Sequence, residues 1–330
     1  MPAKTQMNDA FAAQLESLMP KSQPWLIAVS GGLDSMVLLH FLKKAGYESL
    51  KVCHVNHQLR GQESDLDAAF VAEVSEGMGF KCDLETVDVE AAVAERKESL
   101  EAVARDLRYA ALAKVAERRG CSNVVTAHHA DDQVETVLMN FFRGSGDRGL
   151  SGMDQISSRV IRGTTLNIFR PLLQVTREEL ENYASENEVS FREDESNFDD
   201  FALRNRVRNT LMPTLNEVFQ RDVRGAVLRA AELSRINEAW MAGAEGELPR
   251  RENGLDVSAL REMDAGRRDR VLLSWLRECG VPDCGHAEVS RVAEILLSDE
   301  RPAKVNLPNG HHVRRRAGIL FLESPPNELE

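Results

Sequence analysis

Between residues 25 and 142, short apolar runs alternate with longer segments whose apolar residues recur every three or four positions. Such short runs predict buried strands, and the spacing of three to four predicts amphipathic helices. The predicted strands are residues 25–29, 50–57, 81–89 and 123–127, and the predicted helices are residues 34–44, 64–77, 98–119 and 131–142. This alternation indicates an α/β fold with a parallel sheet and right-handed crossovers.

The pattern changes after this block. Residues 159–173 predict a hairpin, and Thr176 followed by Glu179 predicts a helix that begins with a capping box. We place a domain boundary near residue 215. Beyond it, the pattern predicts a smaller, mainly helical domain with helices at residues 222–244, 267–279 and 286–297, and two strands around a turn at residues 308–310.

Polar segments follow three of the predicted strands. SGGLDS (residues 30–35) follows the first, HVNHQLR (residues 54–60) includes the end of the second, and AHHADD (residues 127–132) includes the end of the fourth. The carboxyl ends of parallel strands meet at one edge of a sheet, where ligands of such folds bind. We therefore expect these segments to meet in one ligand site.

SGGLDS is the segment that most directly indicates chemistry. The chain lacks GxxxxGK[ST], and no GxGxxG follows the first strand, which argues against a P-loop NTPase and a dinucleotide-binding protein. Two glycines let phosphate oxygens approach the backbone N–H groups, and the start of the following helix adds partial positive charge. We therefore expect nucleotide phosphates to contact Ser30, Gly31, Gly32, Leu33, Asp34 and Ser35.

Two side chains of this segment have more specific expectations. Asp34 would repel phosphate unless it holds a cation, so we expect it to bind Mg²⁺. The hydroxyl groups of Ser30 and Ser35 can donate hydrogen bonds to phosphate. The alternative is a tight turn in which Asp34 and Ser35 cap the helix.

The composition is that of an ordinary folded protein, with 42% hydrophobic and 28% charged residues among 330. No apolar run reaches the roughly 18 residues of a membrane span, and the N-terminus lacks the layout of a secretory signal. The five cysteines form no CxxC pair and lie in apolar segments, which favours reduced thiols. We expect a cytoplasmic protein with no membrane partner.

The formal net charge of −12 argues against non-specific coating of nucleic acid. Basic clusters nevertheless occur at residues 204–208, 221–224 and 311–316. Each cluster alone fits an ordinary solvated face, but together they keep a polyanionic partner open. The sequence leaves the oligomeric state open, with a homodimer as one alternative.

At SGGLDS the chain resembles the N-type ATP pyrophosphatases, which split ATP between the α- and β-phosphates with SGGxDS. Further motifs narrow the resemblance to the tRNA(Ile)-lysidine synthetase family: HVNHQLR (54–60), LEAVARDLRY (100–109), AHHADDQVETVLMNFFRGSG (127–146), RPLL (170–173), and EDESNFD with LRNRVRNTLMP (193–213). These motifs cover most of residues 25–215, in order. Residues 216–330 resemble the smaller helical domain of that family loosely, and Gln58 stands where the family commonly has glycine.

The resemblance implies an N-type ATP pyrophosphatase catalytic domain in residues 1–215 and a tRNA-binding accessory domain in residues 216–330. It implies that ATP adenylates the C2 oxygen of the wobble cytidine in the CAU anticodon of tRNA(Ile). Free L-lysine then displaces AMP and leaves lysidine, which changes decoding from AUG to AUA. ATP and Mg²⁺ would be the cofactors, and tRNA(Ile) and lysine the partners.

The implied reaction assigns roles to several residues. Asp132 would share the metal with Asp34, and Arg108 would face phosphate unless it is a helix-surface arginine. With a pKa of about 10.4, roughly one lysine amine in a few thousand is neutral at pH 7, so a base or desolvation must help. His129 is the candidate base, and the alternative is that it contacts phosphate.

Substrate contacts are expected after the AHHADD segment and before residue 215. Glu135 either pairs with the amino group of lysine or is an ordinary surface residue. Arg204, Asn205 and Arg208 suit RNA phosphate or the nucleotide.

Two further sets of residues remain open on sequence alone. His54 and His57 either take part in the site or hold the end of their strand. Chemistry at C2 requires an unstacked cytidine, and the candidates for an aromatic platform, each also readable as a core residue, are Phe141, Phe142 and Phe169.

Three other functions compete with this interpretation. A tRNA thiolase would use cysteines beside the strand ends, where this chain has none. An ammonia-using synthetase acting on a small molecule would not need the basic clusters. A non-catalytic nucleotide-binding module would keep its function after Asp34→Ala.

Overall fold

The computed structural model describes residues 7–96, 98–192, 203–281, 284–298 and 303–323. The chain divides into two compact units, Met1–Leu233 and Ser234–Glu330, and each is described by itself. No helix within the described residues is both long and apolar enough to cross a membrane. The functional boundary near residue 215 stays a prediction.

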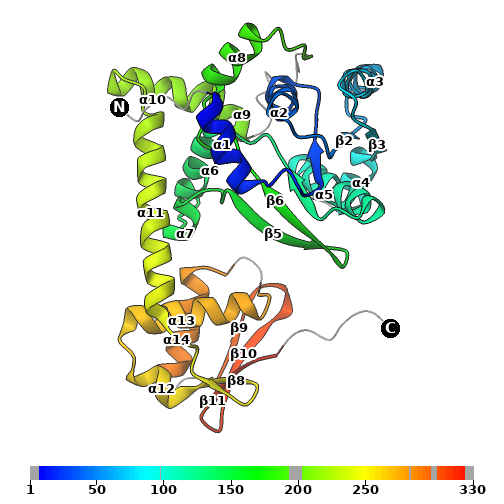
Figure 1. Ribbon diagram of the computed structural model, residues 1–330. Coiled ribbons are helices and arrows are strands. Elements are labelled where there is room, and N and C mark those ends of the chain that lie inside the picture. The colour runs from blue at the N-terminus through cyan, green and yellow to red at the C-terminus, as the bar shows by residue number, and fades with distance from the viewer. Residues whose placement is uncertain (1–6, 97, 193–202, 282–283, 299–302, 324–330) are drawn as a thin grey trace. The chain divides into compact units, whose positions relative to one another are not determined.

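The first unit is built on a six-stranded sheet with β1 (Trp25–Ala28) in its interior (Figure 1). The strands follow the order β3-β2-β1-β4-β6-β5, and every neighbouring pair is parallel except β5 with β6. The predicted parallel sheet and the hairpin are therefore confirmed. The other strands are β2 (Leu50–Asn56), β3 (Cys82–Thr86), β4 (Asn123–Val125), β5 (Ile156–Ile161) and β6 (Thr164–Phe169).

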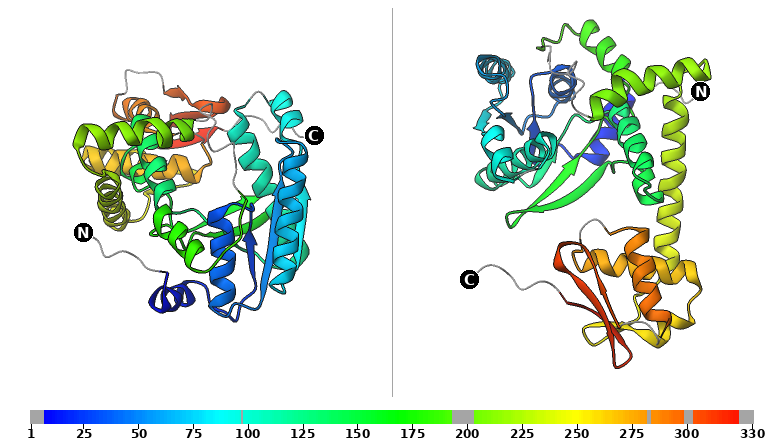
Figure 2. Two further views of the ribbon diagram at one scale, coloured as in Figure 1. Left: turned by 90° about the horizontal axis from the view of Figure 1, so that it is seen from above. Right: turned by 180° about the vertical axis from the view of Figure 1, so that it is seen from behind.

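Helices cover both faces of this sheet (Figures 1 and 2), because successive residues of a strand point to opposite sides. Trp25 and Ile27 of β1 are buried in one apolar cluster, which includes residues of α1, α2 and α8. Leu26, between them, belongs to a second cluster, which includes residues of α5. The helices of this unit are α1 (Asp9–Leu18), α2 (Leu33–Lys44), α3 (Gln62–Gly77), α4 (Val89–Arg96), α5 (Leu100–Arg119), α6 (Ala130–Phe142), α7 (Asp147–Leu150), α8 (Arg177–Glu186), α9 (Leu203–Arg206), the π-helix η2 (Val207–Leu211), α10 (Met212–Phe219) and α11 (Arg224–Glu245), which continues into the second unit.

One local prediction differs from the structure. The strand predicted over residues 81–89 ends at Thr86, and the helix α4 begins at Val89, whose side chain is fully buried. The apolar pattern therefore does not show that the chain passes from a strand to a helix between Thr86 and Val89. The capping box at the start of α8 is confirmed, since Thr176 and Glu179 each accept from the backbone N–H of the other.

The second unit packs helices against a five-stranded antiparallel sheet, ordered β7-β8-β11-β10-β9. Around the turn at residues 308–310 the sequence predicts two strands, whereas the structure has three, β9, β10 and β11. The extra strand arises because Ala317 and Gly318 both take positive φ and turn the chain between β10 and β11. Trp275 and Leu276 lie in the core between helices and sheet. The elements are β7 (Arg250–Arg251), β8 (Gly254–Asp256), α12 (Val257–Glu262), α13 (Ala265–Glu278), α14 (His286–Leu297), β9 (Lys304–Asn306), η3 (Pro308–Gly310), β10 (His312–Arg316) and β11 (Ile319–Glu323).

Candidate active site

The loop after β1 is held in shape by one buried hydroxyl group. Ser35, in the first turn of α2, accepts hydrogen bonds from the backbone N–H groups of Ser30 (3.1 Å) and Gly31 (3.2 Å). The same hydroxyl donates to the carbonyl oxygen of Gly32 at 3.0 Å. The sequence predicted that Ser35 donates to phosphate, whereas the structure uses its hydroxyl within the loop. We therefore assign Ser35 to shaping the loop.

The two glycines of the loop have different reasons to lack a side chain. Gly31 has a φ of +97°, and a Cβ there would lie 3.2 Å from Cγ2 of Val71, so its conformation favours glycine. Gly32 has a φ of −77° and is the N-cap residue of α2. Among the described residues no side chain caps this helix, so its first N–H groups are available to an anion.

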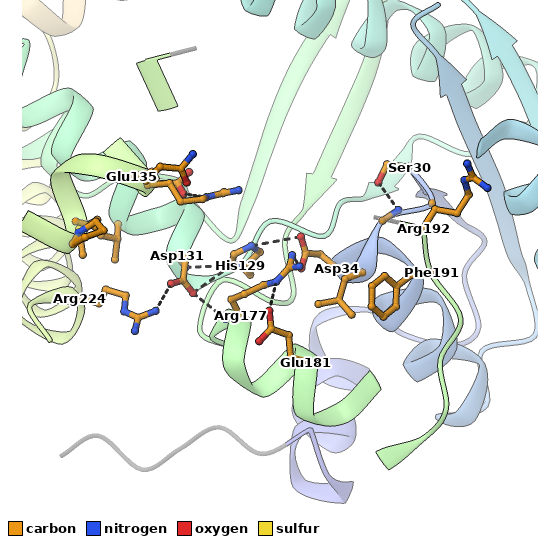
Figure 3. Close-up of a pocket in the computed structure, with 18 of the residues that line it drawn as sticks. Ser30, Asp34, His129, Asp131, Glu135, Arg177, Glu181, Phe191, Arg192 and Arg224 are labelled. Carbon is orange, nitrogen blue, oxygen red and sulfur yellow. Dashed lines mark hydrogen bonds and ion pairs between the residues drawn. The ribbon is translucent and has the colours of Figure 1, made fainter. Parts of the chain in front are cut away.

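The loop forms part of the wall of a cavity of about 780 Å³ (Figure 3). Residues 30–34 line this cavity, and Arg60 of the HVNHQLR segment lines it too. The predicted meeting of the three polar segments is thus found in the structure. Elements that follow β4 and β6 supply further lining residues, among them His129, Asp131, Glu135, Arg177, Arg208 and Arg224.

His129 is the N-cap residue of α6 and is surrounded by carboxylates. Its Nε2 lies 3.6 Å from Oδ2 of Asp34 and 3.5 Å from Oδ2 of Asp132. Its Nδ1 accepts a hydrogen bond from the backbone N–H of Asp131 at 3.3 Å, which places the proton of the neutral ring on Nε2. Burial disfavours the charged ring, but the carboxylates of Asp34, Asp131 and Asp132 outweigh it and raise the pKa of His129. A ring that is readily charged suits contact with phosphate.

Arg177 forms an ion pair with Asp34, the carboxylate that was predicted to hold the metal ion. Its Nη1 donates to Oδ1 of Asp34 at 2.8 Å, and its Nε donates to Oε1 of Glu181 at 3.0 Å (Figure 3). Burial nevertheless raises the pKa of Asp34, against the attraction of His129 and Arg177. The sequence analysis missed Arg177. The capping box at Thr176 predicts where α8 begins, but no sequence signal shows that Arg177 reaches residue 34.

Asp131 connects the loop region to the first turn of α11. Its Oδ1 accepts a hydrogen bond from Nη1 of Arg224 at 2.8 Å, and its Oδ2 accepts from the backbone N–H of Arg177 at 2.9 Å. Burial works against ionisation, but the nearby ring of His129 and hydrogen bonds from Arg177 and Arg224 hold the pKa of Asp131 well below its usual range. The sequence analysis missed Arg224 and this role of Asp131. Both side chains fix the cavity wall.

Glu135 is buried and lies between two arginines. Its Oε1 accepts from Nε of Arg208 at 2.6 Å, and its Oε2 lies 3.1 Å from Nε of Arg204. Only 2% of the residue is exposed, so the surface alternative for Glu135 is wrong. Burial raises the pKa of Glu135 more than Arg208 and Arg204 lower it. A buried carboxylate in a cavity wall can bind the ammonium group of a substrate.

A short α-helix and the π-helical turn that follows it place the two arginines on that carboxylate. The segment η2 lies between α9 and α10, and Arg204 and Arg208 come from α9 and η2. A π-helical turn widens the spacing of a helix and is often found at functional sites. Arg208 lines the cavity, whereas Arg204 and Asn205 do not. Nη2 of Arg204 donates a hydrogen bond to Oγ1 of Thr136 at 2.9 Å. Asn209 is a further lining residue that the sequence analysis missed.

Asp34 and Asp132 are the carboxylates predicted to hold Mg²⁺. They meet at Nε2 of His129, and Oδ2 of Asp132 accepts from the backbone N–H of His129 at 3.0 Å. Magnesium bound with a nucleotide usually takes one or two carboxylates together with phosphate oxygens and water. Within the described ranges no three His, Cys, Asp or Glu side chains form a metal cage. The two aspartates fit an ion that phosphate also binds.

The other predicted residues lie away from the cavity. Arg108 is on α5 with Asp132 and Arg204 among its charged neighbours, and desolvation, together with nearby arginines, lowers its pKa. His54 is buried and its Nδ1 lies 2.9 Å from the carbonyl oxygen of Val29, so it holds the strand end. The EDESNFD motif at residues 193–199 lies outside the described residues.

The aromatic candidates separate into two environments. Phe169 is 9% exposed and packs edge-on against Trp25, with ring centroids 4.7 Å apart. It is therefore a core residue. Phe141 and Phe142 are 59% and 67% exposed, so the core alternative is wrong for both of them.

Comparison with protein families gives two matches along the chain. The PP-loop domain model matches residues 4–215, and the TilS substrate binding domain model matches residues 255–321. Among solved structures, the U34-tRNA thiolase NcsA from Methanococcus maripaludis is similar with a TM-score of 0.52 and 16% identity, over 69% of this chain and 80% of that chain. At that identity the similarity shows a shared fold.

Curated relatives extend over both matched regions. The chain is 34% identical to a tRNA(Ile)-lysidine synthase from Dehalococcoides mccartyi over 89% of this chain and 64% of that protein. It is 36% identical to those of Parabacteroides distasonis, over 93% of this chain and 67% of that protein, and Thermus thermophilus, over 97% and 60%. The chain thus spans about two thirds of the length of the relatives it matches. From the glycine loop, the cavity and these matches together, the chain belongs to the tRNA(Ile)-lysidine synthase family of PP-loop proteins.

Proposed function

We propose that this chain ligates lysine to C2 of the wobble cytidine in the CAU anticodon of tRNA(Ile), using ATP and releasing AMP and diphosphate. The observation that carries the proposal is that one cavity is lined by both the glycine loop and the buried carboxylate of Glu135. The loop supplies donors for phosphate, and Glu135 supplies a counter-charge for an amine. An enzyme that joins an amine to a nucleotide-activated carbon needs both in one place.

In the first step, the C2 oxygen of cytidine attacks the α-phosphorus of ATP, and the bond to the β-phosphate oxygen breaks. Negative charge grows on the phosphates, so donors already in place lower the barrier. The N–H groups at the start of α2 and the charged ring of His129 are the donors on this chain. Bound Mg²⁺, held by Asp34 and Asp132, would neutralise charge on the leaving diphosphate.

In the second step, the ε-ammonium group of lysine gives a proton to Glu135, whose pKa is raised by burial. The neutral ε-amine then attacks C2, the C2–O bond breaks, and AMP leaves. The ammonium group of lysine would exchange for one of the two guanidinium groups now on Glu135. For His129 we favour contact with phosphate over a role as base, because its Nε2 already carries a proton and faces two carboxylates. Arg208, which lines the cavity beside Glu135, is then free for substrate phosphate.

The test combines the protein with a tRNA(Ile) transcript bearing CAU, ATP and labelled lysine. We expect label retained on the RNA and AMP released in equal amounts. AMP formation without label on the RNA would redirect the proposal to another acceptor, and ADP as product would contradict attack at the α-phosphorus. Asp34→Ala should abolish AMP formation while the fold survives; retained activity would mean a different metal site or no catalytic role.

The positions of the cysteines argue against the alternative of tRNA thiolation. None of the five cysteines lines the cavity. Burial raises the pKa of Cys53 to about 12 and that of Cys82 to about 11, which leaves their thiols un-ionised and poorly nucleophilic. The mass added to the cytidine distinguishes lysine from sulfur.

A further inference from the structure

Two arginines of the first unit stack on one buried tyrosine ring. The Cζ atom of Arg105, on α5, lies 5.4 Å from the ring centroid of Tyr109, and that of Arg159, on β5, lies 4.9 Å from it. Tyr109 is 2% exposed, so its ring is a platform for guanidinium groups rather than for a nucleobase. Stacking fixes the two planar groups in place before any ligand arrives.

These arginines have no acidic partner among the residues that the structure describes. Arg118, on the same helix, shows the ordinary arrangement: it donates to Asp83 at 2.8 Å and to Glu85 at 2.9 Å. In a chain with a net charge of −12, paired arginines are the expectation. The positive charge of Arg105 and Arg159 is therefore available to an external anion.

The positively charged arginines around Tyr109 also repel one another. Arg170 is buried, and the charges of Arg105 and Arg159 add to the effect of burial in lowering its pKa. Burial and the charge of Arg105 likewise lower the pKa of Arg108. Like charges held close together cost free energy, and a bound polyanion removes this cost. The cluster has the electrostatic character of a binding surface.

The cluster continues toward the cavity. The charge of Arg204 helps to lower the pKa of Arg108. Nε of Arg204 lies 3.1 Å from Oε2 of Glu135, which lines the cavity. A phosphate backbone that followed these arginines would bring one of its nucleotides toward the loop and Glu135.

We infer that Arg105 and Arg159, stacked on Tyr109, form a surface that binds the phosphate backbone of the RNA substrate and positions it for the cavity. This inference rests on the proposed function, because it takes the polyanion to be tRNA. The two arginines are positioning residues, since they lie away from the reacting atoms. Contacts to phosphate fix the register of a nucleic acid without reading its bases.

The test is the salt dependence of binding to a tRNA(Ile) transcript for the double variant Arg105→Gln with Arg159→Gln. We expect about a tenfold or larger loss of affinity at low salt and a slope of log K against log [salt] that is smaller by roughly one to two. Nucleotide affinity, measured without RNA, should not change. Lysine at both positions should restore the slope, because the charge returns, but only part of the affinity, because the planar group is missing.

The matched control is the double variant Arg96→Gln with Arg118→Gln, which removes the same charge from arginines that have acidic partners. Arg119 and Lys114 still neutralise Asp83 and Glu85 in that variant. Equal losses in the two double variants would mean that net charge alone matters, and would overturn the inference. A wild-type chain that binds tRNA but transfers no lysine would overturn the proposed function instead, and one that binds no tRNA would overturn both.

Discussion

Nη1 of Arg177 lies 2.8 Å from Oδ1 of Asp34. The carboxylate that the SGGLDS motif offers to a metal ion is therefore already paired with a cation of the chain itself. An ion that binds Asp34 through Oδ1 must displace this guanidinium group, which remains attached to Glu181 through its Nε. The arginine and the metal ion are thus competitors for one carboxylate.

Arg177→Gln should lower the Mg²⁺ concentration needed for half-maximal nucleotide binding. Partly exposed ion pairs contribute about 1 kcal/mol or less, so we expect a decrease of about fivefold at most. Equilibrium binding of a non-hydrolysable ATP analogue across a Mg²⁺ titration measures it. Arg177→Lys keeps the charge and should stay near the wild type. A loss of nucleotide affinity at saturating Mg²⁺ would instead show that Arg177 binds phosphate directly.

The two glycines of the loop should respond differently to alanine. Gly31→Ala forces a methyl group into a backbone with φ +97° and against Val71, so we expect about 1–2 kcal/mol lower free energy of unfolding. Gly32→Ala meets only the Ser30 hydroxyl at 3.7 Å, so its Tm should be unchanged or slightly higher. Its methyl group faces the cavity, and ATP affinity should fall. Normal ATP binding by Gly32→Ala would contradict the phosphate site.

Glu135→Gln should weaken lysine binding selectively. The amide keeps the volume of the side chain but removes the charge, and a charge-assisted hydrogen bond contributes about 1.5–3 kcal/mol. We expect the KM for lysine to rise about tenfold to a hundredfold, while the KM for ATP stays close to the wild-type value. Glu181→Gln is the control, because Glu181 lines the same cavity but is exposed. Equal effects of the two variants would exclude a lysine site at Glu135.

Stability at acid pH should depend on His57. Burial, and then the charges of Arg108 and His54, lower the pKa of His57 to about 4 in the folded chain. The unfolded chain binds this proton near pH 6.5, so folding excludes it and the free energy of unfolding falls as the pH drops from about 6.5 toward 4. The slope from this group is at most about 1.4 kcal/mol per pH unit.

The measurement is urea denaturation of wild type and His57→Gln between pH 4 and pH 8. The variant should lose less stability below pH 6.5 than the wild type, and the difference between the two should be constant above pH 7.5. A difference that stays constant over the whole range would show that His57 titrates normally in the folded chain.

Local patterns predicted much of this molecule. The alternation of apolar runs and amphipathic segments predicts β1, β2, β4 and the helices between them, because burial on both faces of a parallel sheet leaves long apolar runs. The SGGLDS and AHHADD segments could be placed at one edge because the topology of such sheets fixes where the strands end. The cavity confirms that placement.

Long-range partners could not be predicted. Arg177 and Asp34 are 143 positions apart, and the sequence around Arg177 indicates no more than the start of a helix. In the sequence, Glu135 resembles any polar residue of an amphipathic helix. Its pairing with Arg208 of η2 is a tertiary contact that only the structure shows. The role of Ser35 was also hidden, because a hydroxyl beside a phosphate motif serves either the ligand or the loop. Side-chain pairing depends on tertiary contacts that periodicity does not encode.

The strand β3 lies at one edge of the six-stranded sheet, and it carries Asp83 and Glu85, both 8% exposed and both paired with arginine or lysine of α5. A strand from another molecule that paired with this edge would have to approach a row of charged groups. Natural sheets blunt their open edges with charge of this kind. The salt bridges of β3 therefore protect the sheet against growing by strand addition from one molecule to the next.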